Sequence, residues 1–196
     1  MKIMRDLVSI QDTVEKVYAA SPDEAMSKWF YKGHVAVVAD YAEEIAEKAG
    51  ADKELAVLSA LFHDVARAWE VEKDPELMNE SLEYAQKQMK ECGYSDDDFE
   101  QVKEAIVPHS CRTGPPGTEL GKILATADAL AHLMTDFYFI LPFYGWLKAA
   151  DNFDGYRDWL LEKIDRDLNK KIFFEEYKEM AVPRYEAMKL IFSKPS

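Results

Sequence analysis

The chain has 196 residues, a formal net charge of -13 at pH 7 and 48% hydrophobic residues. This length suffices for one domain with a hydrophobic core, and the negative charge disfavours binding to polymeric DNA or RNA, whose phosphates it repels. Two cysteines give no disulfide framework, and no apolar stretch has the length of a membrane span or of a signal-peptide core. We therefore expect a cytoplasmic globular protein without a membrane partner.

Apolar residues recur mostly at spacings of three and four, which predicts an all-α fold. The first predicted helix begins at Ser21, which can cap it, and Gly33 is expected to mark a break. A second helix is predicted from His34 to Lys48, ending before Gly50. A third helix is predicted over residues 52–69, with the sequence "DKELAVLSALFHDVARAW".

The later elements follow the same helical spacing. They are predicted in this order: a helix over 74–93 entered through Asp74–Pro75, a helix over 95–110 with Ser95 as its cap, a loop over Thr113–Gly117, a helix over 119–137, a turn over Asn152–Gly155, and one or two amphipathic helices over 156–193 broken near Pro183.

Asp128 lies in the segment "KILATADALAHLM", where nearly every neighbour is Ala, Leu, Ile or Met. A helix of this composition is buried almost all round, so a lone aspartate in it needs a cation or strong hydrogen-bond donors. His132 lies four residues later and shares the face of Asp128. Two interpretations follow: an Asp–His hydrogen bond inside the helical bundle, or metal ligation.

The segment "LFHDVARAW" places His63 and Asp64 among apolar residues in the same way. Neutral imidazole and carboxylate groups are typical ligands of Zn, Mn, Fe or Co, and helical bundles hold such ions in their cores. His34 at the start of one helix, His63 and Asp64 on the next, and Asp128 on a later one would supply four ligands. A bound cation would neutralise both carboxylates.

The order His34, His63–Asp64 and Asp128 resembles the H…HD…D signature of the HD-domain superfamily of metal-dependent phosphohydrolases. The stretches "GHVAVVADYAEEIAEKAGADKELAVLSALFHDVAR" and "VKEAIVPHSCRTGPPGTELGKILATADAL" are similar to the two halves of that domain. The resemblance implies an all-α helical bundle, a divalent metal ion and hydrolysis of a phosphate ester, often of a nucleotide. We therefore expect a single all-helical HD domain over 1–196, with a metal-binding core at about 32–135 and C-terminal helices over 136–196 completing the bundle.

One departure from the family pattern concerns the number of metal ions. Several HD proteins with two metals carry an additional histidine where this chain has "LMNESLEYA", with Asn79 and Glu80. Glu80 is an alternative oxygen ligand there. We expect one well-held divalent ion (Mn, Fe, Co, Ni, Zn or Mg) and at most a weak second one, which disfavours the di-iron chemistry of HD oxygenases.

The resemblance also implies roles in hydrolysis by metal-activated water. Asp64 would ligate the metal and orient or deprotonate the water, and His109, which matches the later histidine of the family, would face the substrate phosphate or protonate the leaving group. Arg67 is the third catalytic candidate because phosphoryl transfer needs cations, although a solvated surface charge is the other interpretation. The candidates for substrate binding are His109, Ser110, Arg112 and Lys122.

Three classes of function remain open at this point. The first is a phosphomonoesterase or phosphodiesterase acting on a small phosphorylated molecule, with a nucleotide as the favoured substrate. A close variant is a dinucleoside polyphosphate hydrolase, because "AIVPHSCRTG" is similar to that subfamily. The second is a non-catalytic metal-binding or ligand-sensing module, for which a homodimer through the aromatic segment 136–147 is possible. The third is an HD-type oxygenase.

Overall fold

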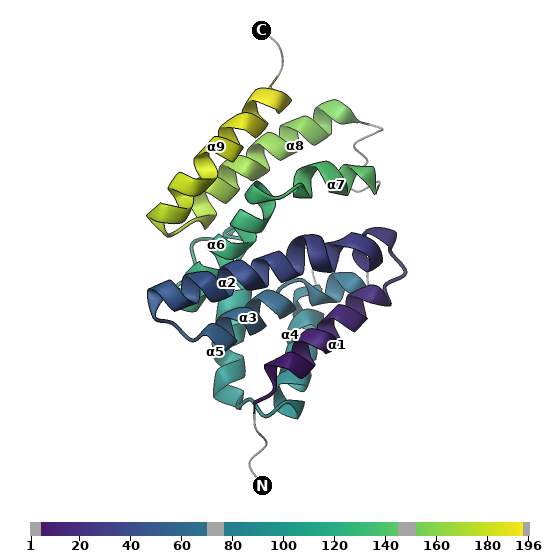
Figure 1. Ribbon diagram of the computed structural model, residues 1–196, viewed down its shortest axis with the longest axis vertical. Coiled ribbons are helices and arrows are strands. Elements are labelled where there is room, and N and C mark those ends of the chain that lie inside the picture. Colours follow the sequence, from purple (N-terminus) through teal and green to yellow (C-terminus); the bar gives the residue numbers. More distant parts are fainter. Residues whose placement is uncertain (1–4, 70–76, 145–151, 194–196) are drawn as a thin grey trace.

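The computed structural model describes residues 5–69, 77–144 and 152–193, and these residues contain helices and no strand. The all-α prediction is therefore confirmed. Figure 1 shows α1 to α5 in the lower part of the molecule and α7, α8 and α9 in the upper part. Helix α6 contacts helices of both groups, among them α2, α5 and α9.

The bounds of the elements follow in chain order. They are α1 (Leu7–Ala19), the π-helix η1 (Met26–Val35), α2 (Ala36–Ala49), α3 (Lys53–Phe62), the 3-10 helix η2 (Val65–Ala68), α4 (Leu77–Glu91), α5 (Asp96–Ile106), α6 (Glu119–Met134), α7 (Phe137–Phe143), α8 (Phe153–Arg166), the π-helix η4 (Asp167–Lys171) and α9 (Glu175–Phe192).

Helix α1 precedes every helix that the sequence analysis anticipated. Asp6 caps it by accepting a hydrogen bond from the backbone N–H of Ser9 at 3.0 Å. Ile10, Val14 and Tyr18 recur every four residues and are buried, so one face of this helix joins the core.

The predicted break at Gly33 is wrong, because η1 runs directly into α2. The glycine instead allows the indole ring of Trp29 to lie against the backbone. A Cβ atom at residue 33 would overlap the indole ring of Trp29, so the ring or the backbone would have to shift. Gly33 thus marks a close contact inside a helix, immediately before His34.

The single helix predicted over 52–69 is also wrong, because α3 ends at Phe62 and the chain turns at His63 and Asp64. Two hydrogen bonds from other helices anchor the backbone around this turn. Tyr18 of α1 donates its hydroxyl to the carbonyl oxygen of Asp64 at 2.9 Å. The N–H of Ala66 donates to Oγ of Ser81 in α4 at 3.1 Å. These tertiary contacts outweigh the helical periodicity of the sequence.

The tail also departs from the prediction, because Pro183 lies inside α9 and the break falls at residues 172–174, between η4 and α9. Pro183 is exposed, so water can solvate the carbonyl that loses its partner. Thr126 of α6 fixes the end of η4. Its hydroxyl donates to the carbonyl of Lys171 at 3.2 Å and accepts from the N–H of Phe173 at 3.1 Å.

Two other predicted features are confirmed, although the helices predicted over 95–110 and 119–137 end earlier, at Ile106 and Met134. Ser95 caps α5 in a reciprocal capping box with Asp98. The Thr113–Gly117 loop contains no helix, whereas Asn152 is the cap of α8 rather than part of a separate turn. Asp74–Pro75 lies outside the described residues.

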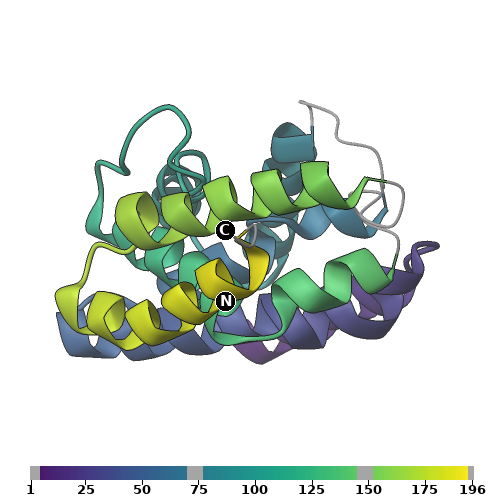
Figure 2. The same cartoon turned by 90° about the horizontal axis from the view of Figure 1, so that it is seen from above.

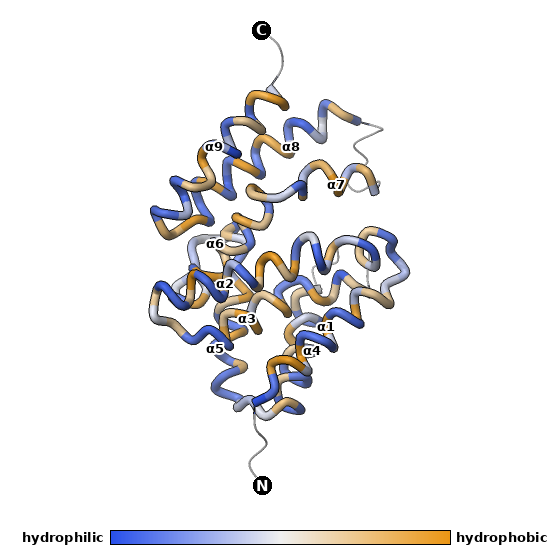
Figure 3. Tube along the Cα trace, viewed as in Figure 1, coloured by the Kyte–Doolittle hydropathy of each residue, from blue (hydrophilic) through white to orange (hydrophobic). Residues whose placement is uncertain are grey.

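Apolar residues gather where the helices face one another, as the colouring in Figure 3 shows. Helix α6 is buried over most of its length, and α8 and α9 lie side by side in both Figure 1 and Figure 2. Among the described helices, none alone is long and apolar enough to cross a membrane. Helices α6 and α7 meet that length and composition only as a pair bent by 69°.

Candidate metal centre

Imidazole nitrogens of three histidines face a single oxygen of Asp128. The Nε2 atoms of His34 and His132 each lie 3.4 Å from Oδ1, and Nε2 of His63 lies 3.8 Å from it. These separations are longer than ordinary N–H···O hydrogen bonds. Ligand atoms about 2.1 Å from one metal ion are about 3.0 to 3.4 Å apart at octahedral or tetrahedral angles. The spacing therefore fits side chains that share a cation.

Two overlapping groups of residues could hold such an ion. In each of the groups His34–His63–Asp64 and His34–Asp128–His132, the ligand atoms lie within 4.8 Å of one another. Nε2 of His63 is buried and has no hydrogen-bond partner among the residues that the structure describes. Buried polar atoms nearly always have a partner, and a metal ion would supply one here. The structure thus brings together the four residues that the sequence analysis selected as metal ligands.

The local backbone of each element aims these side chains inward. His34 comes from η1, His63 and Asp64 from the turn after α3, and Asp128 from α6. Nδ1 of His63 lies 2.6 Å from the carbonyl oxygen of Ala60, the preceding turn of α3. Because Nδ1 donates its proton to this carbonyl, the lone pair of Nε2 faces the site.

Burial disfavours the charged form of two imidazoles, those of His34 and His109, and a metal ligand must be neutral. Desolvation, assisted by the nearby ring of His132, lowers the pKa of His34 well below its ordinary value. Desolvation also lowers the pKa of His109 to about 4. Both rings are therefore uncharged near neutral pH.

Each carboxylate of the site has a cation beside it. Nε of Arg67 lies 2.7 Å from Oδ2 of Asp64, and Nζ of Lys171 donates to Oδ2 of Asp128. Burial opposes ionisation of both acids, but Arg67 lowers the pKa of Asp64 below its usual range. His132 and Lys171 lower the pKa of Asp128 in the same way. Both carboxylates are consequently ionised and able to bind a cation.

The sequence analysis missed three charged residues at this site, namely Lys163, Asp167 and Lys171. Asp167 is fully buried and accepts from Nζ of Lys163 at 2.5 and 2.7 Å and from the hydroxyl of Tyr138. The three charged residues are spaced four apart, which places them on one helical face. That spacing in an otherwise amphipathic tail was the available signal.

The predicted substrate-binding residues lie at different depths. The ring of His109 lies 5.3 Å from that of His63, and its Nδ1 lies 2.5 Å from the carbonyl oxygen of Ile106, which turns Nε2 away from α5. Ser110 follows it and is half-buried. Arg112 is exposed, and its side chain has no hydrogen bond or ion pair within the described residues.

Lys122 and Glu80 lie apart from the metal centre. Lys122 precedes Asp128 by six residues, which rotates its side chain about 240° around α6, and the cation beside Asp128 is Lys171 instead. Glu80 accepts a hydrogen bond from the indole N–H of Trp69 at 3.3 Å and belongs to neither ligand group.

Comparisons with known proteins agree with this architecture. Residues 31–133, more than half of the chain, match the profile of the HD domain. The chain therefore belongs to the HD-domain family of metal-dependent hydrolases. No curated protein sequence matches it.

Two solved structures share the fold. The crystal structure of a predicted HD superfamily hydrolase from an uncultured Thermotogales bacterium is 24% identical, covers 97% of this chain and 91% of its own, and has a TM-score of 0.63. The crystal structure of Bacillus subtilis YpgQ in complex with ADP is 23% identical, covers 94% of this chain and 90% of its own, and has a TM-score of 0.67.

Proposed function

We propose that this protein is a metal-dependent phosphohydrolase that cleaves a phosphate ester of a small molecule, with a nucleotide as the favoured substrate. One observation carries the proposal: imidazoles and carboxylates from three separate parts of the chain converge at ligand spacing. We assign His34, His63, Asp64 and Asp128 as ligands of one divalent ion. Such an ion, when bound, polarises a phosphoryl oxygen and acidifies water.

The side chains around the proposed ion have separate roles in hydrolysis. Water attacks phosphorus as the bond to the leaving-group oxygen breaks, and Asp64 accepts the proton that the water loses. Arg67 fixes the orientation of Asp64 through its hydrogen bond at 2.7 Å and adds positive charge near the phosphoryl group. We assign His109 to the phosphate. Its Nδ1 donates to the carbonyl of Ile106, so Nε2 binds a phosphate oxygen by donation only when it takes up a proton with the substrate.

A nucleotide is favoured as substrate for two reasons. The HD-domain family resemblance points to phosphate esters, often of nucleotides, and the similar Bacillus subtilis YpgQ was solved in complex with ADP. Ser110 follows His109 directly and the exposed Arg112 lies two residues further on, so both extend the proposed phosphate-binding region toward solvent. Lys122 was the fourth candidate for substrate binding and faces away from Asp128, so we assign it no role.

A phosphatase screen in which each metal is added separately tests the proposed function. The purified protein would be assayed against nucleotides and aryl phosphates with Mn, Co, Ni and Mg added separately, and its metal content measured by mass spectrometry. We expect hydrolysis with at least one of these metals. Asp64→Ala should remove both bound metal and activity, whereas Asp158→Ala, which changes an exposed acid on α8, should change neither.

Two results would contradict the proposal. A metal-loaded wild-type protein that hydrolyses none of these compounds would favour the ligand-sensing module. An Asp64→Ala variant that remains active and metal-loaded would show that the reaction, if present, uses another site.

A further inference from the structure

We propose that His132 is an additional ligand of the metal ion and that Asp167 holds its ring in the ligating orientation. The proposal deepens the proposed function, since it rests on the same metal centre. It adds the imidazole of His132 to the four assigned ligands. Through Asp167 it also extends the metal centre beyond residues 31–133, the segment that matches the HD domain.

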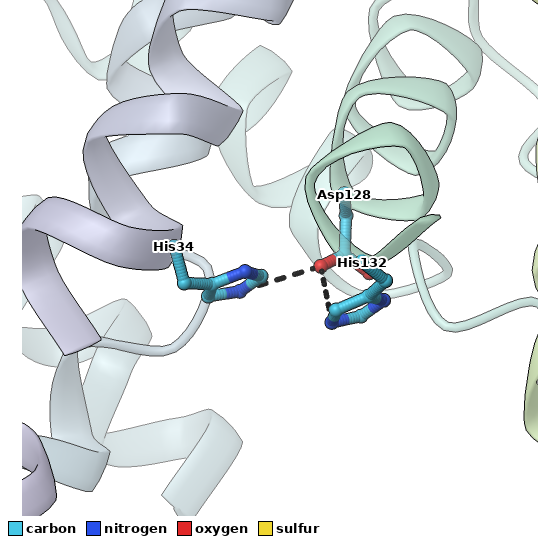
Figure 4. Close-up of side chains that lie close together, drawn as sticks. All are labelled: His34, Asp128 and His132. Carbon is cyan, nitrogen blue, oxygen red and sulfur yellow. Dashed lines mark ion pairs between the residues drawn. The ribbon is translucent and has the colours of Figure 1, made fainter. Parts of the chain in front are cut away.

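Nε2 of His132 lies at the same distance from Oδ1 of Asp128 as Nε2 of His34 does. Both Nε2 atoms lie 3.4 Å from Oδ1, and Figure 4 shows them approaching this oxygen from two different elements. The two rings are stacked, with centroids 4.9 Å apart and planes 3° from parallel. A cation bound by His34 and Asp128 therefore lies within reach of Nε2 of His132.

The other ring nitrogen shows which tautomer fits. Nδ1 of His132 lies 3.2 Å from Oδ2 of Asp167. A carboxylate that accepts the Nδ1 proton leaves the lone pair of Nε2 directed toward the metal, as is common for metal-bound histidines. Nζ of Lys163 also lies 3.1 Å from Nδ1, but its bonds to Asp167 are shorter, at 2.5 and 2.7 Å. Lys163 thus pairs first with the carboxylate.

The alternative is a structural hydrogen bond from Nε2–H of His132 to Asp128. The separation of 3.4 Å is too long for such a bond, and Asp128 already accepts from Lys171 through Oδ2. Five protein ligands also exceed the four of an ordinary zinc site and suit a six-coordinate ion such as Mn, Fe, Co or Ni, with one position open.

The number of imidazoles around the bound ion tests the proposal directly in the wild-type protein. One equivalent of Co²⁺ would be added to the purified full chain, and the imidazole ligands counted by X-ray absorption spectroscopy. We expect three, from His34, His63 and His132. Because this measurement needs no mutant, it remains decisive if a variant fails to fold.

Variants supply the energetic test, with the Kd for Co²⁺ measured by calorimetry. Loss of a residue that hydrogen-bonds to a metal ligand typically weakens metal binding about 10–100-fold. His132→Gln removes a ligand itself, so it should raise this Kd by at least as much and remove one imidazole from the count. Asp167→Asn should raise the Kd about 10-fold with all three imidazoles retained. Asp158→Asn, which makes the same substitution at an exposed acid on α8, is the control, and its Kd should equal that of the wild type.

The outcomes separate this proposal from the proposed function. A count of two imidazoles in the wild type, or an unchanged Kd in a folded His132→Gln variant, would overturn the role of His132 and leave the four-ligand site intact. A wild-type protein that binds no Co²⁺ would overturn the metal centre itself and the proposed function with it.

Discussion

The ammonium of Lys171 donates to Oδ2 of Asp128, while the imidazoles of His34 and His132 face Oδ1 of the same carboxylate. Lys171→Met would leave Asp128 as a buried anion without this counter-charge. We expect the free energy of unfolding in EDTA to fall by about 3 kcal/mol. Added Mn²⁺ should then raise the Tm more in the variant than in the wild type, because the cation replaces the lost charge.

Circular dichroism melts with and without Mn²⁺ measure both effects of Lys171→Met. Lys170→Met is the control, since Lys170 is the exposed neighbour and its loss should leave the Tm unchanged. Equal Tm values for Lys171→Met and the wild type in EDTA would contradict the expected role of this ion pair.

Tyr18 anchors the turn that carries two proposed metal ligands, through its hydrogen bond to the carbonyl of Asp64. Tyr18→Phe removes this bond with little change in shape and leaves the carbonyl without its buried donor. We expect a loss of about 1 kcal/mol in urea denaturation and a weaker metal affinity, because the turn is less well fixed. Tyr41→Phe, a half-buried tyrosine on α2, is the control. The same stability for both variants would argue against the anchor.

For Gly33→Ala, the sign of the change in unfolding free energy tests whether Trp29 packs tightly on residue 33. Helix propensity alone favours alanine by about 1 kcal/mol, but the new Cβ would lie 2.2 Å from the indole of Trp29. We expect a net destabilisation of about 1 to 3 kcal/mol by chemical denaturation. In a Trp29→Leu background the same substitution should cost less, and a double-mutant cycle measures the difference. A stabilised single mutant would mean that the indole moves aside freely.

The capping box of α5 predicts a dependence of stability on pH. Burial opposes ionisation of Asp98, but hydrogen bonds from Ser95 at 2.9 Å and from Arg5 at 2.5 Å lower its pKa. A folded pKa below the unfolded value of about 3.9 contributes stability above that value, and this stability is lost as the pH falls through the folded pKa. The stability difference between wild type and Asp98→Asn should therefore shrink below about pH 4.

Urea denaturation at several pH values measures this difference for Asp98→Asn. Asp97→Asn, an exposed neighbour in the same helical turn, controls for the change in net charge. A difference that stays constant down to the acid end of the range would show that Asp98 is not ionised in the folded state to the extent expected.

The sequence predicted the convergence of the proposed ligands because each lies where an unpaired polar group is costly. Asp128 is flanked by alanines, and His63–Asp64 by leucine, phenylalanine and valine, so each carboxylate needs a positively charged partner in the core. Lys163 and Lys171 gave only a weaker signal, which is their spacing on one helical face with Asp167. Long charged side chains in an amphipathic tail look alike whether they end in water or against a buried carboxylate, and only the packing of η4 on α6 decides.

The local errors at Gly33 and at residues 63–69 have one physical origin. Sequence patterns report local preferences, whereas Trp29 covers the glycine and Tyr18 holds the turn from another helix. A contact between neighbouring turns of one helix decided the first position and a contact between residues far apart in the chain decided the second, and hydrophobic periodicity reveals neither.

The π-helical winding of η1 affects how related chains should be aligned with this one. Each turn of a π-helix encloses one more residue than a turn of an α-helix. A relative that is one residue shorter between Met26 and Val35 would wind as an ordinary α-helix there and still present its histidine to the same place. The gap in the alignment would then belong inside a continuous helix. An alignment that moves this gap into a neighbouring loop would shift the helix by one residue and pair His34 with the wrong residue of the relative.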